Sequence, residues 1–118
     1  MEFFQDAIPV FTEAIQESPT NPKFYFYRGV CYGNWFKSAN AIADYNKAIE
    51  LDPTYMEAYG NRANEKGNLL TTQQKSNLTP ELTKSICEDL DKCKQLGGNK
   101  NGELDDLIYI YCERPKGK

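Results

Sequence analysis

The chain has no histidine, few arginines and no long apolar run, and each shortage excludes a class of function. Without histidine, the usual Ser–His and Cys–His nucleophile pairs are missing, so the sequence predicts a protein that is not an enzyme. A zinc site needs clustered imidazoles or thiolates, and none of the cysteines forms a C-x-x-C pair. We therefore expect neither a bound metal nor a cofactor.

Acidic residues outnumber basic ones, 17 to 14. The net charge is −3 and the arginines are only Arg28, Arg62 and Arg114, which argues against nucleic acid as a partner. No stretch approaches the roughly 18 apolar residues that span a membrane. The start, MEFFQDAIPVF, has no basic region and does not resemble a signal peptide. We expect a cytoplasmic protein; the alternative is a chain from which an upstream, exporting segment has been removed.

The remaining polar and sulfur groups have ordinary explanations. We expect the cysteines to be small buried side chains, although a disulfide between the last two helices is an alternative in an exported protein. These residues are Cys31, Cys87, Cys93 and Cys112. The carboxylate pairs at 88–89 and 105–106 lie on predicted helices, where we expect solvated faces.

An internal repeat dominates the sequence. Ten residues recur 34 positions later: Ala7, Ile8, Ala14, Ile15, Pro19, Thr20, Tyr25, Arg28, Gly33 and Asn34. A fixed period of this length indicates one supersecondary unit stacked on copies of itself. Such stacks present extended surfaces to partners, so the period favours binding over catalysis.

The apolar spacing predicts pairs of helices. A stripe at Ala41, Tyr45 and Ala48 indicates a helix over 38–51, with Ser38 as its N-cap. An earlier helix over 3–17 carries a similar stripe, and different helices begin at Pro22 and Met56. Gly29, in mid-helix, costs roughly 1 kcal/mol in helix propensity, which predicts a close approach between two helices there.

The segment from Pro22 to Tyr55 resembles a tetratricopeptide repeat. The segment ends in KAIELDPT, an ending typical of the family. The residues that match the family pattern are Tyr25, Gly29, Tyr32, Ala41, Tyr45, Ala48 and Pro53. The resemblance implies an all-α fold, a right-handed superhelix of helical hairpins with about two and a half repeats plus a capping helix. The run CEDLDKCKQLG is similar to C-terminal repeats of bacterial members, which suggests a bacterial source.

On this reading residues 1–118 form one domain. Residues 3–18 are the second helix of a partial repeat, 22–55 a full repeat, 56–98 a repeat with a loop insertion, and 102–112 the capping helix. A 45-residue offset, which aligns Asp44 with Asp89, places about 11 extra residues within LLTTQQKSNLTP. Thr79 is the expected N-cap of the next helix and Gly97–Gly98 its end. Helix 3–17 lacks a neighbour, which suggests truncation, an upstream domain or a partner chain.

The resemblance also implies a concave groove lined by the first helix of each repeat. The residues carried over to it are Lys23, Phe26, Tyr27, Val30, Asn34, Glu57, Asn61, Asn64 and Asn68. Asparagine amides both donate and accept, so they can pair with a peptide backbone. The two aromatic residues offer anchor area of the kind found at binding hot spots. The alternatives are a merely solvated face and, for the aromatics, packing against helix 3–17.

Family members that capture chaperone tails hold the terminal carboxylate with a clamp of basic and asparagine side chains. Asn61 matches one clamp position, but Phe26, Val30 and Glu57 stand where lysine or asparagine is needed. The clamp is incomplete, so we do not expect this chain to bind a chaperone tail.

Trp35 and Phe36 fall in the turn between paired helices, where they either close the bottom of the repeat, as we expect, or form an exposed patch for a partner.

The sequence thus predicts a non-enzymatic adaptor that binds a peptide or protein segment in its groove. One alternative is a structural role in which helix 3–17 forms a homodimer. Another is RNA binding by helical repeats, against which the acidic balance weighs.

Overall fold

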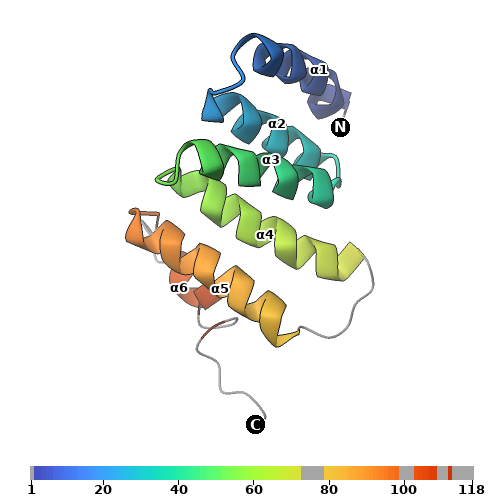
Figure 1. Ribbon diagram of the computed structural model, residues 1–118. Helices are drawn as coiled ribbons and strands as arrows, with labels where there is room; N and C mark the ends of the chain where they lie inside the picture. The colour runs from blue at the N-terminus through green and yellow to red at the C-terminus, as the bar shows by residue number, and fades with distance from the viewer. Residues whose placement is uncertain (1, 73–78, 99–102, 109–111, 113–118) are drawn as a thin grey trace.

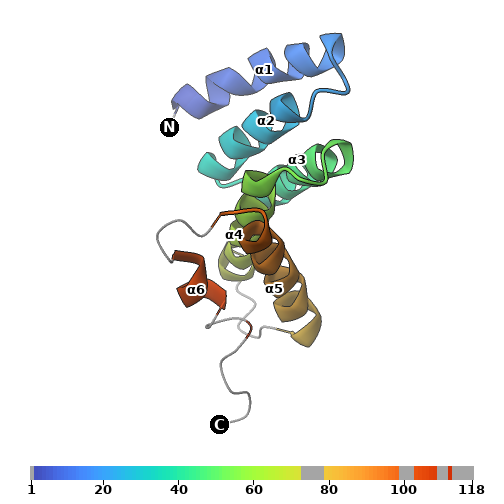
Figure 2. The same cartoon turned by 90° about the vertical axis from the view of Figure 1, so that its left-hand side faces the viewer.

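The computed structural model describes residues 2–72, 79–98, 103–108 and 112. These residues form helices and no strand: α1 (Glu2–Glu17), α2 (Pro22–Asn34), α3 (Ser38–Leu51), α4 (Met56–Thr72), α5 (Pro80–Gln95) and α6 (Glu103–Ile108). The first five stack in chain order, each packing against the next (Figure 1). The short α6 packs against α5, on one side of the stack (Figure 2). The result is an elongated all-α molecule of 51 × 31 × 24 Å.

Several helix ends follow from local sequence signals. Asn21 precedes α2, and its side chain accepts a hydrogen bond from the Lys23 backbone N–H while Pro22 occupies the first turn. Thr79 caps α5 in the same way by accepting from the Leu82 N–H, as predicted. Beyond α5, Gly97 has a φ of 98°, and the Gly98 N–H donates to the Cys93 carbonyl. The predicted stop at this pair of glycines is therefore confirmed.

Other local predictions need correction. The residue before α3 is Lys37, and Ser38 is already helical; its hydroxyl donates to Glu65 Oε1 at 2.7 Å instead of capping its own helix. The segment expected to be a loop begins later than predicted, because α4 continues to Thr72, and 73–78 lie outside the described residues. For the expected capping helix, the structure describes α6 over Glu103–Ile108; residues 102 and 109–111 are outside its description.

The predicted close approach at Gly29 is present. A Cβ at this position would lie 2.7 Å from Tyr45 Cε1, so α2 and α3 can cross at this distance only because the side chain is missing. Tyr45 is 2% exposed and is flanked along α3 by the fully buried Ala41 and Ala48. Further along the stack, Ile86 and Leu90 of α5 form the centre of a second apolar cluster with α4 and α6.

Two arginine clips recur at equivalent places in the stack. Arg28 of α2 donates two hydrogen bonds to Asp44 of α3 and a third to Thr12 of α1. Arg62 of α4 does the same with Asp89 of α5 and Asn46 of α3. Each clip therefore joins three successive helices.

The second clip overturns one expectation. Asp89 is not part of a solvated face: it is 3% exposed and also accepts a hydrogen bond from Lys66 at 2.8 Å. Asp44, its counterpart at the 45-residue offset, is likewise buried. Buried carboxylates at both positions reflect the pairing of each with an arginine.

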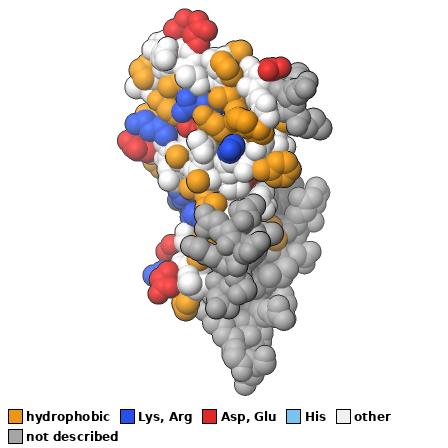
Figure 3. All heavy atoms as spheres, turned by 90° about the vertical axis from the view of Figure 1, so that its right-hand side faces the viewer, with side chains coloured by type: hydrophobic (Ala, Val, Ile, Leu, Met, Phe, Trp, Pro, Cys, Tyr) orange, Lys and Arg blue, Asp and Glu red, His pale blue; other side chains and the backbone are white. Residues whose placement is uncertain are grey.

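The turn between α2 and α3 differs from the preferred prediction. Phe36 is 83% exposed with a φ of 60°, so it does not close the bottom of the repeat; Trp35 is half-buried, with the Lys37 ammonium 5.2 Å from its ring centre. Figure 3 views the side of the stack where α2 turns into α3, and hydrophobic side chains gather there at the height of α1 to α3.

The cysteines divide into two kinds. Cys31 and Cys93 are buried thiols, as expected, and burial raises the pKa of each. Cys87 of α5 and Cys112 form a disulfide with their Cα atoms 5.5 Å apart. For these two cysteines the structure therefore contains the alternative, a disulfide, instead of buried free thiols.

Candidate functional site: two adjoining hollows

A polar hollow of about 350 Å3 lies between α2, α3 and α4. Its lining is Val30, Gly33, Asn34, Tyr45, Asn61, Asn64, Glu65 and Asn68. Of the nine residues predicted to face a groove, the hollow brings together Val30 and the four asparagines. Its volume falls in the range of roughly 300–1,000 Å3 that is usual for ligand pockets.

The asparagines differ in how firmly they are held. The Asn61 amide lies 3.5 Å from the Tyr45 hydroxyl and is half-buried. Asn34 donates to the Val30 carbonyl, and Asn68 donates to Glu65 Oε1 at 3.3 Å, yet both remain exposed. Asn64 is also exposed, in the middle of the row on α4. A ligand in the hollow would therefore meet amide groups that can both donate and accept.

Tyr45 forms an aromatic part of the lining. Burial raises the pKa of its phenol well above the ordinary value, and the negative charge of Glu65 acts in the same direction. The hydroxyl therefore stays protonated at neutral pH and remains available for hydrogen bonding. Tyr45 thus belongs to the core beneath the hollow and also forms part of the lining of the hollow.

The other four predicted residues lie outside this lining. Phe26 is half-buried and stacks on Tyr55 with ring centres 4.9 Å apart. Tyr27 is 42% exposed and lies 5.6 Å from the Phe11 ring of α1, so it packs against the first helix as the alternative prediction had it. Lys23 and Glu57 are exposed. Through its stacking on Phe26, Tyr55, which sequence reasoning missed, packs with the aromatic residues of α2, and burial raises its pKa to about 12.

Sequence reasoning also missed Glu65. It is 6% exposed, its carboxylate accepts hydrogen bonds from Ser38 and Asn68, and it lines the polar hollow. A signal was present: Glu65 follows Asn61 by four positions, so the two side chains share a face of α4. A Cβ at Gly33 would collide with Glu65 Oε2, so the glycine makes room for the carboxylate.

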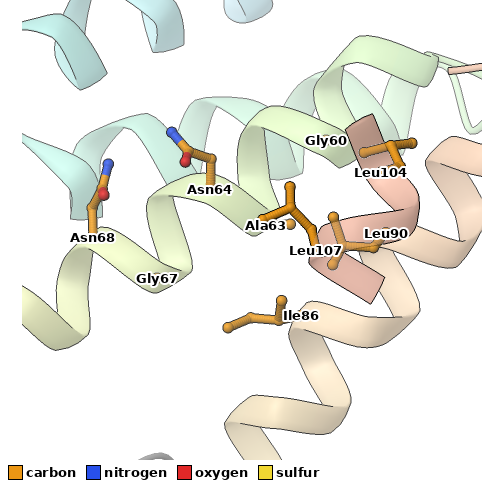
Figure 4. A pocket seen from close by; sticks show the side chains of 9 residues that line it. All are labelled: Gly60, Ala63, Asn64, Gly67, Asn68, Ile86, Leu90, Leu104 and Leu107. Carbon is orange, nitrogen blue, oxygen red and sulfur yellow. The ribbon is translucent and has the colours of Figure 1, made fainter. Parts of the chain in front are cut away.

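A second, apolar hollow of about 180 Å3 adjoins the first. It lies between α4, α5 and α6, and its side walls are formed by Ile86, Leu90, Leu104 and Leu107 (Figure 4). Asn64 and Asn68 line both hollows, and Figure 4 shows their side chains standing on α4 and pointing away from Ile86. The two hollows therefore lie on either side of Asn64 and Asn68, one polar and one apolar.

Two further observations concern what the described residues can hold. No cluster of three or more metal-ligating side chains of the His, Cys, Asp and Glu types occurs in the part of the chain that the structure describes. None of its described helices is long and apolar enough to cross a membrane.

Comparison with known proteins gives one family match: residues 22–55 match the tetratricopeptide repeat model. The chain is also similar to Hsp70-Hsp90 organizing protein 2 of Arabidopsis thaliana, with 28% identity over 108 residues, which is 86% of this chain and 19% of that protein. It therefore spans about a fifth of the length of that relative. Other curated relatives come from fission yeast and human, so they lend no support to the predicted bacterial source.

Solved structures show the same fold. The first tetratricopeptide domain of Spaghetti (RPAP3), bound to the HSP90 peptide SRMEEVD, matches 95% of this chain and 79% of its own, with a TM-score of 0.77 and 21% identity. The TPR2B domain of yeast Sti1, in its pHsp70 complex, matches 97% of this chain and 86% of its own, with a TM-score of 0.74 and 25% identity. The chain thus contains a tetratricopeptide repeat at residues 22–55 and has the all-α superhelical fold of tetratricopeptide repeat domains.

Proposed function

We propose that this chain is a non-enzymatic interaction module that binds a peptide or protein segment in the polar hollow between α2, α3 and α4. The observation that carries the proposal is the row of asparagines: Asn34, Asn61, Asn64 and Asn68 all line this one hollow. Amides spaced along a surface can pair with the backbone of an extended segment and so contribute affinity, while pockets beside them select its side chains.

The relatives support this class of function. Their names describe organizing proteins for Hsp70 and Hsp90, and two of the structures contain chaperone partners. A domain of the same fold with a hollow on the side formed by α2 and α4 is suited to the same kind of task, the capture of a segment from another protein.

The particular ligand of those relatives fits this hollow poorly. The HSP90 peptide in the RPAP3 structure, SRMEEVD, is acidic towards its end. Here the clamp positions hold Phe26, Val30 and Glu57. Among the described residues, the lining of the polar hollow includes Glu65 but no lysine or arginine. An acidic tail would find a like charge instead of a counter-charge, so we propose a different segment.

The location of the protein is also a proposal. A cytoplasmic protein is what the sequence led us to expect, whereas disulfides persist mainly in oxidising compartments. The Cys87–Cys112 bond therefore weighs towards an oxidising site of action. Alkylation of the protein in freshly broken cells, followed by mass spectrometry, separates the two: blocked thiols at both positions indicate a reducing compartment.

The test is a peptide-display selection against the whole chain, repeated with the Asn61→Ala/Asn64→Ala variant. We expect enriched peptides that the variant no longer retains. The variant should keep its helicity and lose little stability, because Asn64 is exposed and Asn61 makes only one long hydrogen bond. Asn40→Ala is the matched control, since Asn40 is exposed on α3 and lines neither hollow.

Two results would count against the proposal. Peptides that bind the double variant as well as the original chain would place the site elsewhere. If no peptide enriches, light scattering tests the alternative of self-association through α1, where Val10 is 64% exposed.

A further inference from the structure

Glu65 is a buried carboxylate without the cationic partner that the other buried carboxylates of the described residues have. The other two buried carboxylates of the described residues, Asp44 and Asp89, each pair with an arginine. No lysine or arginine of the described chain forms an ion pair with Glu65, whose carboxylate is held by the neutral groups of Ser38 and Asn68. A carboxylate removed from water in this way gains strongly from a cation that arrives to pair with it.

One oxygen of this carboxylate is free to take a ligand. Both hydrogen bonds go to Oε1, at 2.7 Å from the Ser38 hydroxyl and 3.3 Å from the Asn68 amide. Oε2 accepts no hydrogen bond in the described part of the chain, where every fully buried side-chain oxygen has a partner, so Oε2 is not fully buried. Glu65 itself lines the polar hollow. The residue is thus fixed by one oxygen and presents the other.

The charge of the polar hollow follows from its lining. Glu65 is the charged residue among the described residues that form it, and the rest are amides, Tyr45, Val30 and Gly33. A single uncompensated negative charge in a concave, partly desolvated place attracts cations and repels anions. The hollow is therefore complementary to a lysine or arginine side chain.

The apolar hollow beside it adds a second requirement. Its volume, about 180 Å3, is close to the roughly 150 Å3 of a dry cavity that takes one benzene molecule. It suits one apolar side chain of about that size, such as leucine or phenylalanine. The hollow is not fully enclosed, and Leu107, which forms part of its wall, is 41% exposed.

We propose that the ligand of this module is an extended segment of a partner protein that places a lysine or arginine against Glu65 and a nearby apolar side chain in the apolar hollow. Asn64 and Asn68, which line both hollows, then pair with the backbone between the two side chains. In an extended segment neighbouring side chains point to opposite faces, so the two anchors reach different walls. This inference rests on the function proposed above and names its ligand class.

The experiment starts from the same display selection with the whole chain. We expect the enriched peptides to share a basic residue close to an apolar one. One such peptide is then synthesised with its basic residue as found and with that residue replaced by glutamine, and the affinity of each is measured by calorimetry. We expect at least tenfold weaker binding of the glutamine peptide, and weaker binding of the original at high salt.

The matched variants are Glu65→Gln, which keeps the shape and the acceptor for Ser38, and Glu13→Gln, an exposed carboxylate on α1. Glu65→Gln should weaken the binding of the basic peptide about tenfold and leave the affinity of the glutamine peptide unchanged. Glu13→Gln should change neither affinity. Leu107→Ala should weaken the binding of peptides that contain the apolar residue. The peptide-side substitution needs no altered chain, so it decides the question even if Glu65→Gln fails to fold.

The outcomes separate the two proposals. Enriched peptides that lack a basic residue, or that bind Glu65→Gln as tightly as the original chain, overturn this inference and leave the peptide-binding function standing. Peptides rich in aspartate or glutamate would overturn it too. If no peptide enriches at all, the proposed function fails, and the inference fails with it.

Discussion

Gly29 sets the distance between α2 and α3, because any larger side chain meets the ring of Tyr45. Gly29→Ala should gain roughly 1 kcal/mol in helix propensity. It should lose more, about 1–3 kcal/mol, by overpacking at a site where the new methyl group would sit 2.7 Å from Tyr45 Cε1. We therefore expect a lower free energy of unfolding in urea. In a Tyr45→Leu background the sign should reverse; a penalty that persists there would place the clash elsewhere.

Tyr45 also makes stability depend on pH in the alkaline range. Its pKa is raised in the folded chain by burial, so the folded state keeps the phenolic proton at a pH where the unfolded state loses it. The contribution is complete below the unfolded pKa of about 10 and is lost as the pH rises towards the folded value. We expect the urea midpoint to fall steeply above about pH 10.

Tyr45→Phe tests this dependence, since it removes the titrating group and retains the ring. The variant should show a shallower alkaline fall, although not a flat one, because burial also raises the pKa of Tyr55 to about 12. The difference between the ultraviolet absorbance titrations of the original chain and of the variant follows the tyrosinate of Tyr45. An alkaline slope identical to that of the original chain would contradict the assignment to Tyr45.

At the scale of elements, the arginine clips are the main polar link between helices. Arg28→Met should cost about 3–5 kcal/mol, because it leaves Asp44 buried without its partner. The double variant Arg28→Met/Asp44→Leu should cost less, since it removes the stranded charge as well. Lys47→Ala, at the exposed Lys47–Glu50 pair, is the control and should change stability by under about 1 kcal/mol. Equal losses for the single and double variants would show that the clip contributes only packing.

The clips also show which parts of the fold the sequence could predict. The 34-residue period relates Arg28 to Arg62, and the 45-residue offset relates Asp44 to Asp89. The equivalence was therefore visible, but the burial of Asp89 was not, since it depends on how α4 and α5 pack. Ser38 failed for the same reason: the local pattern indicates a cap, whereas Glu65, 27 residues away, takes the hydroxyl.

The candidate site divides along the same line. Three of the asparagines share a face of α4 and Asn34 lies on α2. The groove that the family resemblance implies groups them, so sequence reasoning named most of the residues that line the polar hollow. The apolar hollow depends on where the short α6 lies against α5, a long-range matter that periodicity does not determine. Phe26 and Tyr27 were predictable only in part. The sequence placed both on the helix that begins at Pro22, but it did not determine that Phe26 stacks on Tyr55 while Tyr27 packs against Phe11.

For the whole molecule, stability depends on which helices are in contact. Successive helices pack together, with a small further contact between α2 and α4, and nothing in the described chain brings α1 back to α5 or α6. Stability in such a stack is close to a sum of nearest-neighbour terms, so the ends should open before the middle. Hydrogen exchange followed by mass spectrometry should show α3 and α4 exchanging most slowly and α1 markedly faster.

A single substitution makes this expectation sharper. Thr12→Val leaves the bonds from Arg28 to Asp44 in place. It removes the hydrogen bond, 3.2 Å long, through which Arg28 holds α1, together with the bond from the Thr12 hydroxyl to the Ile8 carbonyl inside α1. A bond of this kind contributes about 1 kcal/mol, so the amides of α1 should exchange about fivefold faster. Those of α5 should be unchanged, because each helix depends chiefly on its neighbours. Faster exchange by the same factor in every helix would mean that the chain opens as one cooperative unit, and the nearest-neighbour description would then be wrong for this stack.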